Sequence, residues 1–171
     1  MLWEKVSSES VCGTSCGYKI QTWVEGDEQN KNEKLMMANT SKAHVTNLTP
    51  NLNNFARIMV FKDTYNGPPS NTIQFKTPEG VPSTVQSLQA FRMGSSAFMV
   101  QWKRPLRTNG DLTGYQIYYQ EVNGTNLGPL KKRASKTLDP DVEHAKLSEL
   151  KSETNYRIHV VGLTKVGEGN E

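Results

Sequence analysis

The chain lacks the features that define several large classes of protein. Its 171 residues include 2 cysteines, too few to staple a small disulfide-rich fold. The longest strongly apolar run, residues 58–61, is far too short to cross a bilayer, and residues 1–3 begin no basic-then-apolar signal peptide. Hydrophobic residues make up only 35% of the chain, although 3 Trp, 6 Tyr and 5 Phe suffice to seed compact cores.

A large charge of one sign is also missing. The 20 Lys and Arg residues nearly balance 17 Asp and Glu residues, which leaves a formal net charge of +3. Residues 1–77 hold 8 basic and 7 acidic residues, and residues 78–171 hold 12 and 10. Neither part has the basic surplus of a dedicated nucleic-acid binder, so we expect no nucleic-acid partner.

Catalytic and metal-binding motifs are not found. His44, His144 and His159 are isolated in the sequence, without the spacing of a zinc-binding pair. There is no glycine-rich phosphate loop and no G-x-S-x-G nucleophile elbow. We therefore expect surface histidines, no cofactor, no metal and no enzymatic activity.

An internal repeat is the strongest positive signal. Four landmarks recur in one order at offsets of 97 to 102 residues: Trp3 and Trp102, Tyr18 and Tyr115, Leu48 and Leu150, Phe55 and Tyr156. This spacing predicts two domains in tandem, each with its four landmarks in the core. The segment 77–83 contains two prolines and a glycine, so we place the boundary there and predict domains at 1–77 and 78–171.

The periodicity within the copies is that of β-strands. In residues 97–102, 115–119 and 156–160 large apolar or aromatic residues recur at every second position and so share one face, and turn signals separate these runs. No window sustains an apolar stripe at helical spacing. Short strands and frequent turns in units of this size predict an all-β sandwich.

These landmarks resemble the fibronectin type III family of immunoglobulin-like β-sandwiches. The run 150–156 matches the family's Leu-x-Pro-x-Thr-x-Tyr sequence except at Ser152, and its Tyr156 would form the tyrosine corner. In the first copy Phe55 lacks the hydroxyl, and its distance from Leu48 is one residue longer. By this resemblance the first domain lacks its first strand and the last strand of the second domain is truncated.

Five segments narrow the resemblance from the whole family to one group of proteins. They are similar to consecutive fibronectin type III repeats of invertebrate neural cell-adhesion molecules of the immunoglobulin superfamily: residues 54–58, 66–70, 77–83, 94–99 and 109–115. The resemblance implies the extracellular part of a single-pass plasma-membrane receptor, with its span outside this segment. It also implies secreted ligands or cell-surface co-receptors as partners, in axon and dendrite patterning. A matrix protein and an intracellular structural array stay open as alternatives.

In an extracellular setting Cys12 and Cys16 would form a small local disulfide, with two free thiols as the alternative. Three N-glycosylation sequons begin at Asn39, Asn47 and Asn123. Asn123 is the best candidate because it lies in a predicted turn, whereas Asn47 is followed by an apolar Leu48 and by Pro50.

Two further groups of residues are candidates for partner binding. Lys131, Lys132 and Arg133 form the one basic run, which we interpret as a solvated loop or as a contact for heparan sulfate and other acidic partners. A dibasic cleavage site for a protease is a further interpretation of the same run. The strand parity places Trp23 and Tyr118 opposite the inward residues. We interpret them as exposed aromatic contacts on a sheet face, with partial cover by a neighbouring loop or strand as the alternative.

Overall fold

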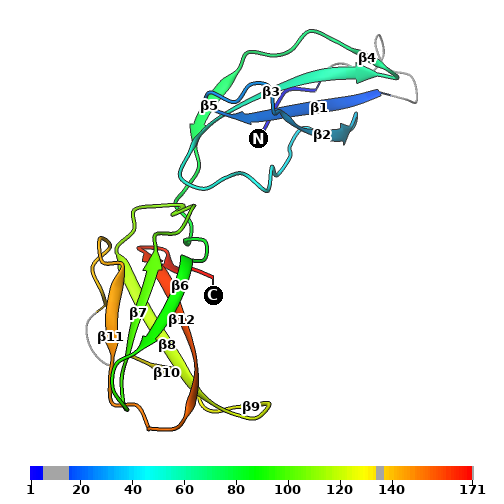
Figure 1. Ribbon diagram of the computed structural model, residues 1–171. Coiled ribbons are helices and arrows are strands. Elements are labelled where there is room, and N and C mark those ends of the chain that lie inside the picture. Colours follow the sequence, from blue (N-terminus) through cyan, green and yellow to red (C-terminus); the bar gives the residue numbers. More distant parts are fainter. Residues whose placement is uncertain (6–15, 134–136, 171) are drawn as a thin grey trace. The chain divides into compact units, whose positions relative to one another are not determined.

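The computed structural model describes residues 1–5, 16–133 and 137–170 (Figure 1). Every regular element assigned within these ranges is a strand, and the strands are labelled β1 to β13. The predicted all-β class is therefore confirmed. The chain divides into two compact units, Met1–Pro78 and Glu79–Glu171. No helix long and apolar enough to cross a membrane occurs among the described residues.

The first unit is built on one antiparallel sheet. Its order is β2 (Asn32–Met37), β1 (Cys16–Val24), β3 (Asn53–Lys62) and β4 (Tyr65–Asn66), and β5 (Ile73–Lys76) also pairs with β3. Leu2 and Lys42 form a separate antiparallel bridge.

The inner face of this sheet carries the core of the first unit. Tyr18, Ile20 and Thr22 alternate along β1 and are buried. The Trp3 ring packs against Tyr18 with 5.2 Å between ring centroids. Trp3 and Leu48 are half-buried rather than fully enclosed, while Tyr18 is buried as predicted.

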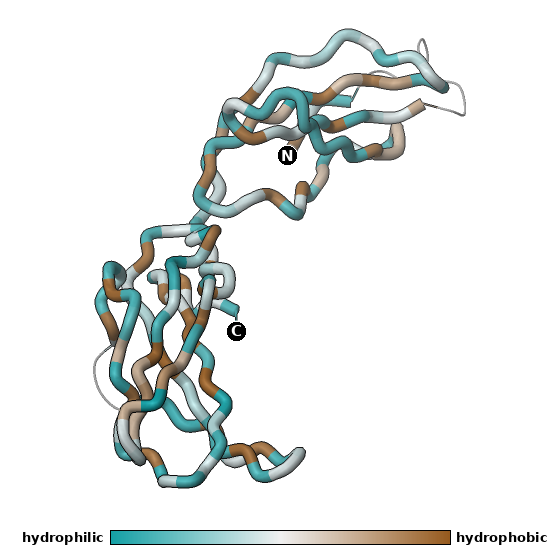
Figure 2. The backbone as a smooth tube through the Cα atoms, viewed as in Figure 1, coloured by the Kyte–Doolittle hydropathy of each residue, from teal (hydrophilic) through white to brown (hydrophobic). Residues whose placement is uncertain are grey.

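The second unit is a sandwich of two antiparallel sheets. One sheet has the order β11 (His144–Leu147), β7 (Phe98–Lys103) and β6 (Gln86–Arg92). The other has the order β10 (Lys131–Lys132), β8 (Gly114–Asn123), β12 (Asn155–Thr164) and β13 (Gly167–Glu168), with β9 (Asn126–Leu127) paired to β8. Figure 2 shows hydrophobic and hydrophilic residues interspersed along these strands rather than gathered in long runs.

The core of the second unit lies between its two sheets. The predicted landmarks Trp102, Tyr115 and Leu150 are buried there, and Tyr156 is half-buried against them. Trp102 and Tyr115 meet edge to face, with 5.3 Å between ring centroids. Burying each such side chain contributes about 1.5–3 kcal/mol to folding.

A glycine before the tyrosine landmark is required in both units. A Cβ on Gly17 would lie 2.2 Å from the carbonyl oxygen of Met36, on the neighbouring strand. A Cβ on Gly114 would lie 2.2 Å from the carbonyl oxygen of Leu138. Gly114 also has a φ of 157°, which disfavours a side chain. The repeated Gly-Tyr pair therefore reflects a close approach of two backbones.

The prediction that Phe55 is the counterpart of Tyr156 is wrong. In the strand register, Tyr156 pairs with Glu121 in the second unit, and the matching pair in the first unit is Asn54 with Val24. Asn54 is buried, whereas Phe55 is half-buried on the opposite face of the sheet. The extra residue between Leu48 and Phe55 shifts the aromatic ring to the other face, because side chains alternate along a strand.

Candidate functional site

The outer face of the β8–β12 sheet holds a cluster around Tyr118. We call Tyr118, Lys132, His159 and Glu168 the outer-face cluster. The Tyr118 hydroxyl lies 2.9 and 2.8 Å from the two carboxylate oxygens of Glu168. Its ring stacks on His159 with 5.2 Å between centroids, and Lys132 Nζ lies 5.7 Å from the ring centre. Lys132 also pairs with Glu168 at 3.6 Å.

The cluster leaves Tyr118 half-buried, which agrees with the alternative of partial cover by neighbouring strands. Desolvation raises the pKa of Tyr118, and its hydrogen bond to the Glu168 carboxylate adds to the rise. The neutral phenol therefore persists as a donor to the carboxylate. This arrangement provides a half-buried aromatic side chain bordered by one carboxylate and one ammonium group, which suits recognition of a polar protein surface.

The sequence suggested that the basic run lies in a solvated loop, but its first two residues lie in a strand. Lys131 and Lys132 form the edge strand β10, which pairs with Tyr119 and Tyr118 of β8. Since successive side chains of a strand point to opposite faces, Lys132 joins the outer-face cluster and Lys131 points to the other side. Arg133 donates from Nε to the carbonyl oxygen of Lys146 at 3.2 Å. The three cations of the run therefore do not gather into one patch.

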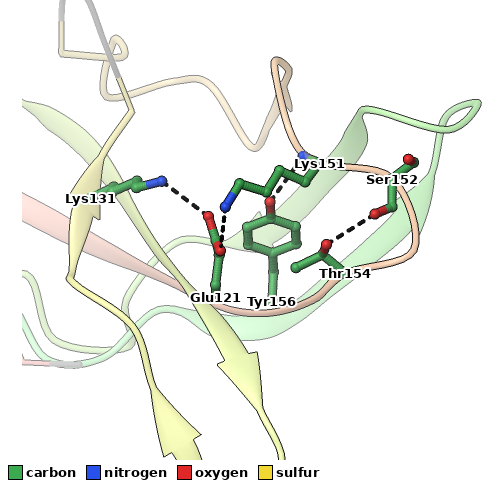
Figure 3. Close-up of polar contacts among 6 residues, drawn as sticks. All are labelled: Glu121, Lys131, Lys151, Ser152, Thr154 and Tyr156. Atoms are coloured by element: carbon green, nitrogen blue, oxygen red, sulfur yellow. Dashed lines mark hydrogen bonds and ion pairs between the residues drawn. The ribbon is translucent and has the colours of Figure 1, made fainter.

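Lys131 belongs to a second arrangement, at the end of the sandwich (Figure 3). Glu121 accepts from Lys131 Nζ at 3.2 Å and from Lys151 Nζ at 2.9 Å. These two ammonium groups lower the pKa of the Glu121 carboxyl, with the Lys151 hydrogen bond as the largest cause. Beside them the Tyr156 hydroxyl accepts a hydrogen bond from the backbone amide of Lys151 at 3.0 Å. This bond is the tyrosine corner that the resemblance implied for Tyr156.

The predicted exposure of Trp23 is wrong. Trp23 does lie on the outer parity of β1, but only 4% of it is exposed. Phe55 stacks on its ring with 5.8 Å between centroids. Lys31 Nζ and the Arg57 guanidinium carbon lie 5.1 and 5.5 Å from the ring centre. The parity rule identified the face, and the alternative of cover by neighbouring segments applies: Phe55 and Arg57 of β3, with Lys31 just before β2, pack against the indole.

A polar chain continues from this indole across the first sheet. Arg57 donates from Nε to Gln21 at 2.8 Å, and Gln21 donates from Nε2 to Glu33 at 2.6 Å. Glu33 also pairs with Lys19 at 3.3 Å. The Gln21 hydrogen bond, with help from Lys19, lowers the pKa of the Glu33 carboxyl. We call this set of residues the outer ladder of the first unit: Trp23, Arg57, Gln21, Glu33 and Lys19. Only the strand pairing reveals it, since its members come from three strands.

The other predicted site residues are dispersed. Asn39, Asn47 and Asn123 are all exposed. Cys16 is the first residue of β1, and Cys12 lies outside the described residues, so the disulfide stays a prediction.

The predicted surface position holds for two of the three histidines. His44 and His144 are exposed, and His159 is half-buried against Tyr118. Among the described residues, no three His, Cys, Asp or Glu side chains gather as a metal-binding group.

Comparison with known proteins extends this picture. The fibronectin type III domain family matches residues 83–171. The chain belongs to the fibronectin type III family. Neuroglian of Drosophila melanogaster is 48% identical over 172 residues, which cover 100% of this chain and 13% of that protein. Neural cell adhesion molecule L1 of Takifugu rubripes is 31% identical over 176 residues, with 98% of this chain and 13% of that protein covered.

A segment of two fibronectin type III domains from chicken tenascin covers 92% of this chain and 82% of its own, at 14% identity and a TM-score of 0.43. This fibronectin type III chain spans about an eighth of the length of the curated relatives that it matches, 13% in both cases. The similarity to neuroglian runs over both units, and so the predicted resemblance to a neural adhesion molecule is confirmed.

Proposed function

We propose that the chain is a non-catalytic segment of the extracellular part of a neuronal cell-adhesion receptor. In this proposal it binds secreted or cell-surface proteins and spaces an adhesive immunoglobulin head from the membrane, in the patterning of axons and dendrites. The receptor would cross the plasma membrane once, outside this segment. The observation that carries the proposal is the 48% identity to neuroglian over the full chain.

The outer-face cluster of the second unit is the proposed contact surface. Tyr118 offers an aromatic ring that is fixed by stacking on His159 and by hydrogen bonds to Glu168. A side chain that is already ordered loses little conformational entropy when a partner binds. Tyr is also one of the residue types that contribute most to binding energy at the centre of a contact.

The test uses the whole chain, secreted as a fusion to a dimeric antibody constant region. We expect it to label the surface of cultured neurons more strongly than that of fibroblasts. Lys132→Glu should reduce the labelling at least tenfold, because it places a carboxylate beside Glu168 and reverses the charge that faces the partner. Arg92→Glu makes the same charge change on the exposed strand β6 of the other sheet and is the matched control.

Equal labelling of the two cell types would contradict the adhesion proposal. Selective labelling of neurons that Lys132→Glu leaves unchanged would keep the adhesion function and reject this contact surface. The competing assignments are an extracellular-matrix protein and an intracellular structural array of fibronectin type III domains. Labelling of the matrix between cells, with none on cell bodies, would favour the first of these.

Heparan sulfate is a second candidate partner, because Lys131, Lys132 and Arg133 are consecutive in the sequence. Lys131 and Lys132 point to opposite sides of β10, and each already has a carboxylate partner. Exposed ion pairs contribute little, so a sulfated chain could compete for them. Retention on heparin at physiological salt, abolished by Lys131→Ala with Lys132→Ala, would support this partner, and no retention would exclude it.

A further inference from the structure

The hairpin between β8 and β9 carries the sequence Asn123-Gly124-Thr125. We propose that Asn123 is the main N-glycosylation site of the chain, with higher occupancy than the sequons at Asn39 and Asn47. The inference rests on the proposed extracellular function, since the modification takes place in the secretory pathway. The glycan would be an oligosaccharide that begins with N-acetylglucosamine.

Exposure of the whole sequon is the first observation. Asn123 is the last residue of β8 and pairs across the hairpin with Asn126. Asn123, Gly124, Thr125 and Asn126 are all exposed, so neither the acceptor amide nor the hydroxyl residue is enclosed by the core. Figure 1 shows this hairpin extending beyond the rest of the second unit, at the β9 label.

The backbone of the turn is the second observation. Gly124 has a φ of 62° and Thr125 does not have a positive φ, the pattern expected for a two-residue turn with glycine first. In the described part of the chain, no heavy atom beyond its chain neighbours lies within 4 Å of where a Cβ on Gly124 would sit. The turn therefore has open space beside Gly124, and the neighbouring Asn123 side chain is itself exposed.

The sequon at Asn47 has a different environment. Asn47 is exposed, but Leu48 and Thr49 are half-buried. The carbonyl oxygen of Thr49 accepts a hydrogen bond from Thr77 Oγ1 at 2.7 Å. This segment must lie close to the sheet for the first unit to fold, and a large glycan beside Leu48 works against that packing.

The sequon at Asn39 lies between these two cases. Asn39 is exposed in a turn, and Thr40 is bonded to Met37 through both its backbone amide and its hydroxyl. Its hydroxyl residue, Ser41, is half-buried, and the Ser41 carbonyl oxygen accepts from the backbone amide of Trp3 at 3.0 Å. We expect lower occupancy here than in the open hairpin.

The reaction transfers an oligosaccharide from a lipid diphosphate donor. Nδ2 of Asn123 forms a bond to the anomeric carbon of the first sugar and loses one proton to a base of the transferase. The bond between that carbon and the diphosphate oxygen breaks, and its electron pair leaves with the lipid diphosphate. No oxidant or reductant is consumed.

The test expresses the full chain with an added secretion signal in a eukaryotic cell line. The signal imposes entry into the secretory pathway, so the outcome reports on the sites even if the proposed adhesion function fails. Enzymatic removal of N-glycans in ¹⁸O-labelled water marks each glycosylated asparagine as labelled aspartate, which peptide mass spectrometry quantifies. We expect the highest labelled fraction at Asn123.

Two variants make the test specific. Asn123→Gln and Thr125→Ala should each remove most of the glycan mass from the intact protein, while Asn126→Gln, directly across the hairpin and outside any sequon, should leave it unchanged. Circular dichroism of the secreted variants verifies that all three are folded. A labelled fraction at Asn123 that is zero, or lower than that at Asn39 or Asn47, would overturn the proposal.

Discussion

Asn54 in the first unit occupies the register position that Tyr156 occupies in the second. Tyr156 uses its hydroxyl to bind the backbone amide of Lys151. Asn54 donates from Nδ2 to the carbonyl oxygen of Leu52 at 2.9 Å and to Thr77 Oγ1 at 3.4 Å. The two units therefore stabilise equivalent corners with different chemistry.

The Asn54 corner depends on Thr77, which lies next to Pro78 at the end of the first unit. Thr77 Oγ1 accepts from the backbone amide of Leu52 at 3.1 Å. We expect Thr77→Val to lower the free energy of unfolding of the first unit by about 1–3 kcal/mol, because it leaves buried polar groups without a partner. Urea denaturation followed by tryptophan fluorescence measures the loss. Thr46→Val, at an exposed threonine, should have no comparable effect.

The tyrosine corner of the second unit makes a smaller contribution. Tyr156→Phe removes the acceptor of the Lys151 amide hydrogen but keeps the ring. Since that amide is exposed, water replaces part of the bond, and we expect a loss of about 0.5–1.5 kcal/mol in the free energy of unfolding. The same change at Tyr65, which is 80% exposed, serves as the control. A larger loss at Tyr65 than at Tyr156 would contradict the role of the corner bond.

Trp23 is expected to be structural rather than a free binding residue. Its indole is 4% exposed and packs against Phe55, Lys31 and Arg57. Trp23→Ala should destabilise the first unit by about 3–5 kcal/mol, as large-to-small changes at enclosed aromatic residues do. Differential scanning calorimetry of the two-unit chain resolves which transition moves. An unchanged first-unit transition would restore the interpretation of Trp23 as an exposed contact.

Glycine is expected to be irreplaceable at Gly17 and Gly114. Alanine at either position would bring a methyl carbon against a backbone carbonyl oxygen at 2.2 Å, so one strand must move. We expect each substitution to cost more than about 3 kcal/mol, each in its own unit. Gly128→Ala, where the nearest atoms lie at an ordinary 3.4 Å, should cost far less and is the control. Equal midpoints of urea-induced unfolding for all three variants would contradict the steric clash between the added methyl group and the backbone carbonyl oxygen.

The acid sensitivity of the second unit should depend in part on Glu121. Lys151 and Lys131 hold its folded-state pKa below the ordinary value of 4.5. A depressed pKa stabilises the fold above pH 4.5, and this contribution disappears as the pH falls through the lowered folded-state pKa. Glu121→Gln should therefore reduce the loss of stability as the pH falls below 4.5, most clearly at low salt. Urea midpoints across this range test it, with Glu149→Gln as the control.

The sequence by itself determined the class of the fold and the core of the second unit. Alternation of apolar residues reports directly which face of a strand is buried, so Trp102 and Tyr115 could be assigned to the core from the sequence. Leu150 lies outside the strands and was assigned from its place in the repeat. The Gly-Tyr pair was also visible as a repeat, although its cause is a contact between strands that are not adjacent in sequence.

Tertiary structure alone decided the register and the surface. One added residue moved Phe55 to the outer face and brought Asn54 to the corner, because the side-chain period of a strand is two. Neighbouring segments covered Trp23 with Lys31 and Arg57, and the pairing of β10 with β8 put Lys131 and Lys132 in a strand rather than in the expected loop. Such neighbours come from distant parts of the chain, and parity along one strand carries no information about what lies beside it.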